Sequence, residues 1–175
     1  RQGSRDRLSL DYSFSYGWQS PCRTKDVLDA TEYAVLMNEM NMNSGMSPVY
    51  DDPKSFGRGT DWQKEVFNYN APVIEHQASI SGGNDKLSYY LSFGYLYNEG
   101  IIGGNFNRSN YDRYSARANT TYTFFDHQER NWLRNFRGGV NMAYSRTTSM
   151  SIGENSERGS ILGSAVSMSP IMKVY

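Results

Sequence analysis

The sequence predicts an all-β protein, an antiparallel sheet that forms part of a transmembrane β-barrel. Five segments alternate large apolar residues with small polar ones at a period of two, as the two faces of a strand require. The five apolar rows contain no Asp, Glu, Lys or Arg, although these residues make up 21% of the chain. The connections alternate between long and short, as in outer-membrane barrels, which have short turns on one side and long loops on the other.

The clearest strand runs from Leu87 to Tyr97. Every second residue is large, so one face carries Leu87, Tyr89, Leu91, Phe93, Tyr95 and Tyr97. A strand of about 11 residues at about 3.3 Å each is roughly 36 Å long. Tilted by about 45°, it rises roughly 25 Å, the height of the apolar band of such a barrel. Strands of soluble proteins average about 5 or 6 residues.

The other strands follow the same pattern, and the residues between them predict their connections. Strands are predicted at about residues 8–17, 73–82, 87–98, 112–125 and 135–146. Gly82-Gly83-Asn84-Asp85 predicts a tight turn, because Gly and Asn tolerate positive φ. We expect the loops 18–72, 99–111 and 147–175 to be extracellular and the turns 83–86 and 126–134 to be periplasmic.

Short helices are predicted inside the long loops. Asp29-x-x-Glu32 has the form of a capping box and predicts a helix through about Met42. Thr60-x-x-Gln63 has the same form and predicts a short helix through Phe67. A further helix is predicted around residues 158–167. The lone cysteine, Cys22, is expected in an exposed loop, because its neighbours are polar or proline.

The alternation has a second interpretation. An antiparallel sheet that is half buried in water shows the same pattern, so a soluble β binding module, or a passive surface barrel without energy coupling, stays an alternative. His76 stands on an otherwise apolar row and fits a membrane wall only near the outer interface. Five strands do not close a barrel, and an open edge in lipid leaves backbone groups unpaired. We therefore expect a fragment of a longer protein.

Composition and motifs indicate a protein that is not an enzyme. The formal net charge is zero, which gives no sign of nucleic acid as a partner. The two histidines, His76 and His127, lie on different elements with no ligand-spaced cysteine or carboxylate, so neither a metal nor another cofactor is expected. No Gly-x-Ser-x-Gly motif occurs.

The order of several short segments resembles the SusC/RagA family of TonB-dependent outer-membrane transporters. These segments are Leu28-Asp29-Ala30-Thr31-Glu32-Tyr33-Ala34, Thr60-Asp61-Trp62-Gln63-Lys64-Glu65-Val66-Phe67, Ser81-Gly82-Gly83-Asn84, Tyr89-Tyr90-Leu91-Ser92-Phe93-Gly94-Tyr95, Asn98-Glu99-Gly100-Ile101-Ile102 and Tyr111-Asp112-Arg113-Tyr114-Ser115-Ala116-Arg117-Ala118-Asn119. Pro170-Ile171 and Val174-Tyr175 are similar to a proline-rich stretch in a later loop of the family. The resemblance covers nearly the whole chain.

The resemblance implies a barrel of 22 strands, of which this chain holds the first five, and a plug domain that is absent here. It also implies a SusD-like surface lipoprotein, the TonB complex acting through the missing N-terminal part, and import of an oligosaccharide or peptide. The location implied is the outer membrane of a Gram-negative, Bacteroidetes-type bacterium, where lipid and lipopolysaccharide surround the barrel.

Candidate binding residues are aromatic side chains near the long loops, because aromatic faces stack on sugar rings and on other apolar groups. These residues are Trp18, Tyr50, Phe56, Trp62 and Phe106. Packing within the loop or anchoring at the membrane interface is the alternative role for each. Arg113 and Arg117 lie two positions apart on one face and are predicted to face the lumen, where they line the channel or pair with acidic groups.

Overall fold

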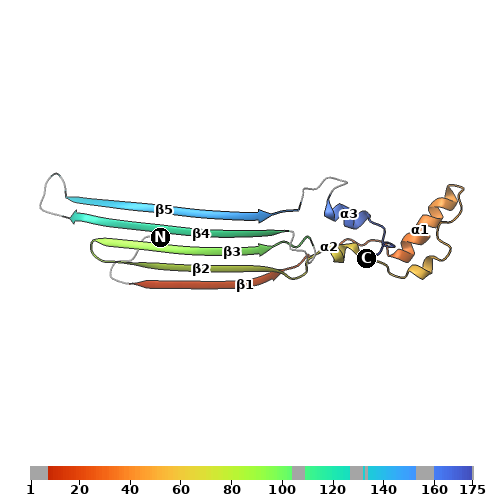
Figure 1. Cartoon of the computed structure of the whole chain (residues 1–175), viewed down its shortest axis with the longest axis horizontal. Coiled ribbons are helices and arrows are strands. Elements are labelled where there is room, and N and C mark those ends of the chain that lie inside the picture. Colours follow the sequence, from red (N-terminus) through yellow and green to blue (C-terminus); the bar gives the residue numbers. More distant parts are fainter. Residues whose placement is uncertain (1–7, 104–108, 127–131, 133, 153–159, 175) are drawn as a thin grey trace. The chain divides into compact units, whose positions relative to one another are not determined.

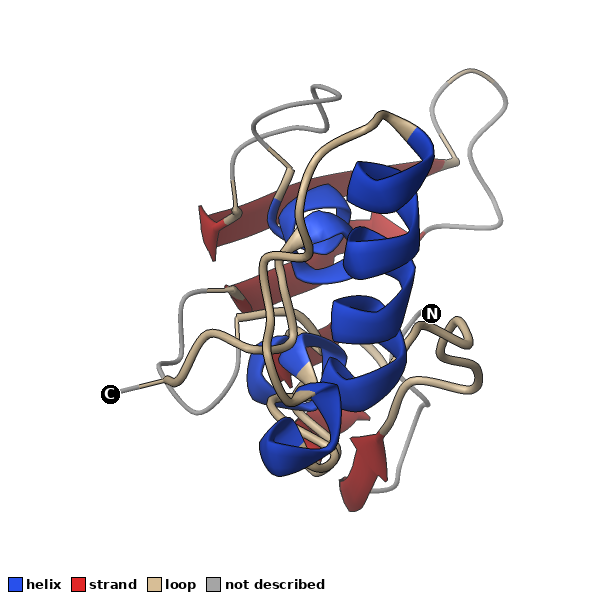
Figure 2. Cartoon of the chain, turned by 90° about the vertical axis from the view of Figure 1, so that its right-hand side faces the viewer, coloured by secondary structure: helices blue, strands red, loops and turns tan. Residues whose placement is uncertain are grey.

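The computed structural model describes residues 8–103, 109–126, 132, 134–152 and 160–174 (Figure 1). These residues form two compact units. The first unit is a β-sheet. The second unit is built from the connections that follow β1, β3 and β5, and all the helices belong to it (Figure 2).

The sheet has five strands in the order β1-β2-β3-β4-β5, and every neighbouring pair is antiparallel. The strands are β1 (Ser9–Gln19), β2 (Ala71–Gly83), β3 (Leu87–Glu99), β4 (Asn110–Asp126) and β5 (Asn135–Met150). Their lengths run from 11 to 17 residues, well beyond a typical soluble strand. β1, β2, β4 and β5 each extend at least two residues past their predicted ends on the side of the long connections.

The register places the five predicted apolar rows on one face. One row across the sheet joins Leu10, Ile80, Leu91, Ala118 and Met142, and the next joins Tyr12, Ala78, Phe93, Ala116 and Tyr144. Because side chains alternate between the two faces of a strand, this pairing also determines which face the remaining residues of each strand occupy. The predicted antiparallel barrel sheet is confirmed.

The apolar face remains uncovered. Leu91 is 45% exposed, Phe93 50% and Met142 66%. Exposed side chains of this size over a whole sheet face require an apolar surrounding, and lipid supplies one. Among the described residues, no helix is both long enough and apolar enough to span a bilayer.

The short connections are the β2–β3 turn and the β4–β5 turn, and the structure describes the first of them fully. Between β2 and β3, the Asn84 side chain accepts hydrogen bonds from the backbone N–H groups of Lys86 and Leu87, at 3.0 and 2.8 Å. This is the tight turn that the sequence predicts. The β4–β5 turn lies mostly outside the described residues. Next to it, the register shifts by one between Thr123 and Phe125, a β-bulge at the end of the sheet.

The second unit contains α1 (Ala30–Asn43), η1 (Pro53–Phe56), α2 (Trp62–Val66) and α3 (Ile161–Ser167). The capping box of α1 is confirmed, since Asp29 accepts from the N–H of Glu32 and Glu32 accepts from the N–H of Asp29. The predicted cap of α2 is wrong by one residue. Asp61 caps that helix, because its carboxylate accepts from the N–H of Lys64.

Candidate functional site

Arg113 and Arg117 lie on the polar face of β4, opposite the apolar rows. Arg117 faces Ser92 on β3 and Ala143 on β5. Both arginines are exposed. Within the described part of the chain, neither arginine takes part in an ion pair. Their place on the face away from lipid follows from the register, and a role in lining a channel stays a prediction.

Trp18 belongs to β1 and not to the loop in which the sequence analysis placed it. It pairs with Pro72 and continues the apolar row of β1, with its ring centroid 6.2 Å from that of Tyr16. Its side chain is 68% exposed. A large aromatic ring at the end of an apolar row is the arrangement of an interface anchor, and this position favours that role over contact with a ligand.

His76 lies on the apolar face, where its ring contacts three aromatic residues and one of its nitrogens has a hydrogen-bond partner. Its Nδ1 lies 2.9 Å from the hydroxyl of Tyr12. Its ring is stacked on Tyr95, with centroids 6.2 Å apart, and lies 4.8 Å from the ring of Phe14. Tyr95 in turn donates to Asp112, at 3.2 Å. These contacts form a belt of aromatic and polar groups towards the end of the sheet where the long connections begin.

The remaining predicted aromatics lie in the second unit. Tyr50 and Phe56 pack edge to face, with ring centroids 5.3 Å apart. The side chain of Asn38 is buried. Its amide donates to the carbonyl of Tyr50 at 2.7 Å and accepts from the N–H of Tyr50 at 3.0 Å. These contacts support loop packing for both rings. Phe106 lies outside the described residues.

Trp62, at the start of α2, is held in a defined orientation. Its indole Nε1 donates to the carbonyl of Ser169, at 3.0 Å. Next to it, Thr60 donates its backbone N–H to the carbonyl of Pro170 at 2.8 Å and its hydroxyl to the carbonyl of Met172 at 2.7 Å. The segments around residues 60 and 170 are therefore joined by three hydrogen bonds.

Gln63 is a structural residue that the sequence analysis missed, because it was considered only as part of a capping box. Its side chain is buried and binds the backbone of Lys25 twice, accepting from the N–H at 2.8 Å and donating to the carbonyl at 2.7 Å. A buried amide that completes both kinds of hydrogen bond rigidifies its surroundings. No local signal in the sequence indicates a partner 38 residues away.

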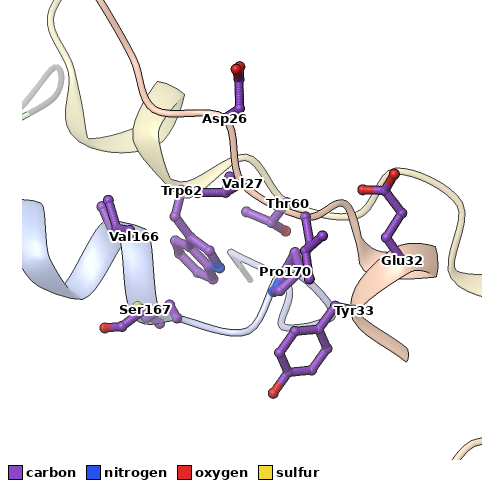
Figure 3. A pocket seen from close by; sticks show the side chains of 12 residues that line it. Asp26, Val27, Glu32, Tyr33, Thr60, Trp62, Val166, Ser167 and Pro170 are labelled. Carbon is purple, nitrogen blue, oxygen red and sulfur yellow. The ribbon is translucent and has the colours of Figure 1, made fainter. Parts of the chain in front are cut away.

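The connections after β1 and β5 line a half-open cavity of about 510 Å³ (Figure 3). Carboxylates are contributed by Asp26 and Glu32, and aromatic rings by Tyr33 and Trp62. Most of the remaining lining is aliphatic, from the stretch before α1 and from α3. Of the predicted binding residues in the described part of the chain, only Trp62 lines this cavity. Within the described residues, no three His, Cys, Asp or Glu side chains come together as a metal site would require.

Comparison with known proteins gives the class of the chain. It is 24% identical to TonB-dependent receptor P3 of Formosa agariphila over 100% of its length, and 30% identical to TonB-dependent receptor SusC of Bacteroides thetaiotaomicron over 95%. It spans 16% and 14%, respectively, of those two relatives. No family model matches the chain.

Solved structures show the same fold. A structure titled as the RagAB peptide transporter matches 98% of this chain and 21% of its own, with a TM-score of 0.70 at 21% identity. A second, of the RagAB peptide importer in a closed state, matches with a TM-score of 0.65 at 22% identity. The similar proteins are thus receptors and transporters rather than enzymes.

The strand register, the exposed apolar rows and these similarities together indicate a segment of a barrel wall similar to that of TonB-dependent receptors. Within that class, the chain is SusC/RagA-like.

Proposed function

We propose that this chain forms five strands of the barrel, together with part of the outer loops, of a TonB-dependent importer in the outer membrane of a Bacteroidetes-type bacterium. The observation that carries the proposal is the exposed face whose predicted apolar rows, free of charged residues, continue across all five strands. A soluble β binding module would gain nothing from such a face, whereas a barrel wall needs it against lipid and lipopolysaccharide.

The loops 18–72, 99–111 and 147–175 are proposed to be extracellular, and the turns 83–86 and 126–134 periplasmic. The long connections all leave from the same end of the strands, because every neighbouring pair is antiparallel. Outer-membrane barrels place their long loops outside. The lumen then faces the polar row that carries Arg113 and Arg117.

The importer is proposed to take up an oligosaccharide or a peptide. Its partners would be a SusD-like surface lipoprotein and the TonB complex, which would act through a plug outside this chain. The similarity to SusC supports this assignment, and so does the fold shared with a peptide transporter. The barrel segment supplies the wall and outer loops, and the energy for transport comes from elsewhere in the assembly.

Labelling in intact cells tests the orientation. Cys22 lies in the first long connection and is exposed, so a membrane-impermeant maleimide should label it without permeabilisation. In a Cys22→Ser background, Asp85→Cys in the β2–β3 turn should be labelled only after the outer membrane is opened. The reverse pattern would invert the proposed orientation, and labelling of both sites in a soluble fraction would exclude a membrane wall.

Uptake measurements test the transport. Cells that express the full-length receptor should accumulate a labelled oligosaccharide or peptide only when TonB is intact. Uptake that is unchanged in a strain without TonB would support the passive barrel instead.

A further inference from the structure

One row of the outward, apolar face of the sheet ends in an arginine. The row crosses all five strands and consists of Phe14, His76, Tyr95, Tyr114 and Arg146. Arg146 lies on β5, directly opposite Tyr114 on β4, and it is exposed. Because side chains alternate between the faces of a strand, Arg146 shares the outward face with Met142 and Tyr144. The outward surface therefore carries a positive charge at this row.

The charge of Arg146 has no acidic partner in the described part of the chain, where it takes part in no ion pair. The carboxylate on the adjoining row belongs to Asp112, one strand away and one row further towards the long connections. That carboxylate accepts a hydrogen bond from the hydroxyl of Tyr95, at 3.2 Å. An arginine that faces lipid is costly unless its head reaches water or a polar partner.

The row of Arg146 lies at the height where lipid headgroups begin. Leu91 is in the middle of the outward rows, and Tyr95 follows it by four residues on β3. This is roughly 13 Å along the strand and roughly 9 Å in depth at a tilt of about 45°. The apolar band extends about 12 Å to either side of its middle. The backbone at Arg146 is therefore just inside the edge of the band, and its long side chain reaches the headgroups.

Two further hydrogen-bond donors accompany Arg146 on the outward face of β5. Tyr144 precedes it by two positions and Thr148 follows it by two, so a phenol, a guanidinium and a hydroxyl succeed one another along the strand. All three residues are exposed, and β5 contains no Asp or Glu. A phosphate accepts hydrogen bonds from each of these groups, and a guanidinium binds it through two parallel N–H bonds.

We propose that Tyr144, Arg146 and Thr148 bind the phosphate of a lipopolysaccharide molecule in the outer leaflet. The inference rests on the proposed barrel and its orientation, in which the long connections face the outside. A phospholipid with an ammonium group beside its phosphate supplies its own cation, whereas a phosphate on the sugar backbone of lipopolysaccharide requires one from elsewhere. A protein carboxylate would be a costly partner here, because it would also have to face lipid.

Native mass spectrometry of the delipidated full-length receptor with its partner subunits tests the proposal. The probes are lipid A, the phosphorylated anchor of lipopolysaccharide, and lipid A from which the phosphates have been removed. We expect the receptor to bind phosphorylated lipid A about tenfold more tightly. Arg146→Gln should abolish most of this preference. Arg146→Lys should retain part of it, because Lys keeps the charge and loses the paired N–H geometry.

Arg137→Gln is the matched control. Arg137 lies on the same strand but on the opposite face of the sheet, and its ion-pair partner is Asp126, at 3.9 Å. This variant should keep the tenfold preference for phosphorylated lipid A. Gel migration without heating shows whether each variant still forms a folded barrel, so a loss of binding can be separated from a loss of folding.

Four results would overturn the inference. The receptor would bind both forms of lipid A equally, or the preference would persist in Arg146→Gln. An excess of inorganic phosphate would displace lipid A, which would indicate a site for free anions. Alternatively, Arg146→Gln would lower the folded fraction and leave the preference unchanged, which would assign Arg146 to an ion pair with a neighbouring strand.

The failure of this inference can be distinguished from the failure of the proposed function. TonB-dependent uptake by a receptor without any preference for phosphorylated lipid A would defeat this inference alone. Loss of TonB dependence, or the reversed labelling pattern of Cys22 and Asp85→Cys, would defeat the proposed function itself.

Discussion

Substitutions at two adjacent residues of β3 would distinguish a sheet that faces lipid from a sheet that lies in water. Leu91 lies in the middle of the apolar face, opposite Ile80 and Ala118, and Ser92 is on the other face. Arg at the bilayer midplane costs about 2–4 kcal/mol on the lipid face. Leu91→Arg should therefore lower the folding equilibrium constant in a membrane by about 25-fold to 700-fold. Ser92→Arg should change it little, because the lumen is wet.

The expected penalty also depends on depth. Tyr97 lies six residues beyond Leu91 on the same face, which is roughly 20 Å along the strand and roughly 14 Å in depth at a tilt of about 45°. That distance is about half the apolar band, so Tyr97→Arg should cost about 0–1 kcal/mol.

Urea titration of the full-length receptor folding into lipid vesicles measures this series. Gel migration without heating reports the folded barrel. Equal penalties at Leu91 and Ser92, or no decrease between Leu91 and Tyr97, would refute a lipid-facing row on β3.

Four further substitutions test the loop unit, each followed by hydrogen exchange or limited proteolysis. Gly59→Ala should loosen the unit markedly, because its φ is +68° and the new Cβ would stand 2.3 Å from the carbonyl oxygen of Pro170. Gly45→Ala should cost only about 1–2 kcal/mol, since its φ is +76° but nothing lies within 4 Å; equal effects would contradict the role of close packing. Asn38→Ala should destabilise its loop by about 1–3 kcal/mol, because it removes three hydrogen bonds to the backbone of Val49 and Tyr50, and unchanged cleavage around residues 44–57 would contradict this expectation. Asp29→Ala should cost about 1 kcal/mol and speed exchange in the first turn of α1 alone.

The sheet could be predicted from the sequence because its determinants are local. A strand that faces lipid on one side must avoid charge at every second residue, and this requirement is visible in a window of ten residues. The turn at Asn84 and the cap at Asp29 are equally local. Each depends on a side chain that bonds to a backbone group within three residues.

The loop unit could not be predicted, because its main contacts join residues far apart in the chain. Gln63 meets Lys25 across 38 positions, and Thr60 meets Met172 across 112. Neither pair produces a periodic pattern in the sequence. The one-residue error at α2 has the same origin. Thr60 has the composition of a cap, but its hydroxyl is used by Met172, and Asp61 therefore takes the capping position.

The register also indicates where the hydrocarbon of the membrane ends along the strands, which the alternating pattern of the sequence alone did not indicate. The sequence predicts these two strands at about residues 112–125 and 135–146, whereas β4 begins at Asn110 and β5 runs to Met150. The last apolar residues on the outward face are Tyr114 and Tyr144. The next residues on the same outward face are Asp112 and Arg146. Both are charged.

A charge on the lipid face is cheap only near the interface, so the apolar band ends close to the row that contains His76, Tyr95 and Tyr114. This explains why the polar atoms of His76 are tolerated there, and why Tyr95 bonds to Asp112. The strands continue beyond this row on the side of the long connections. In the proposed orientation, that end of the sheet stands above the hydrocarbon, and the long connections start from ordered, hydrogen-bonded strands rather than from the membrane surface itself.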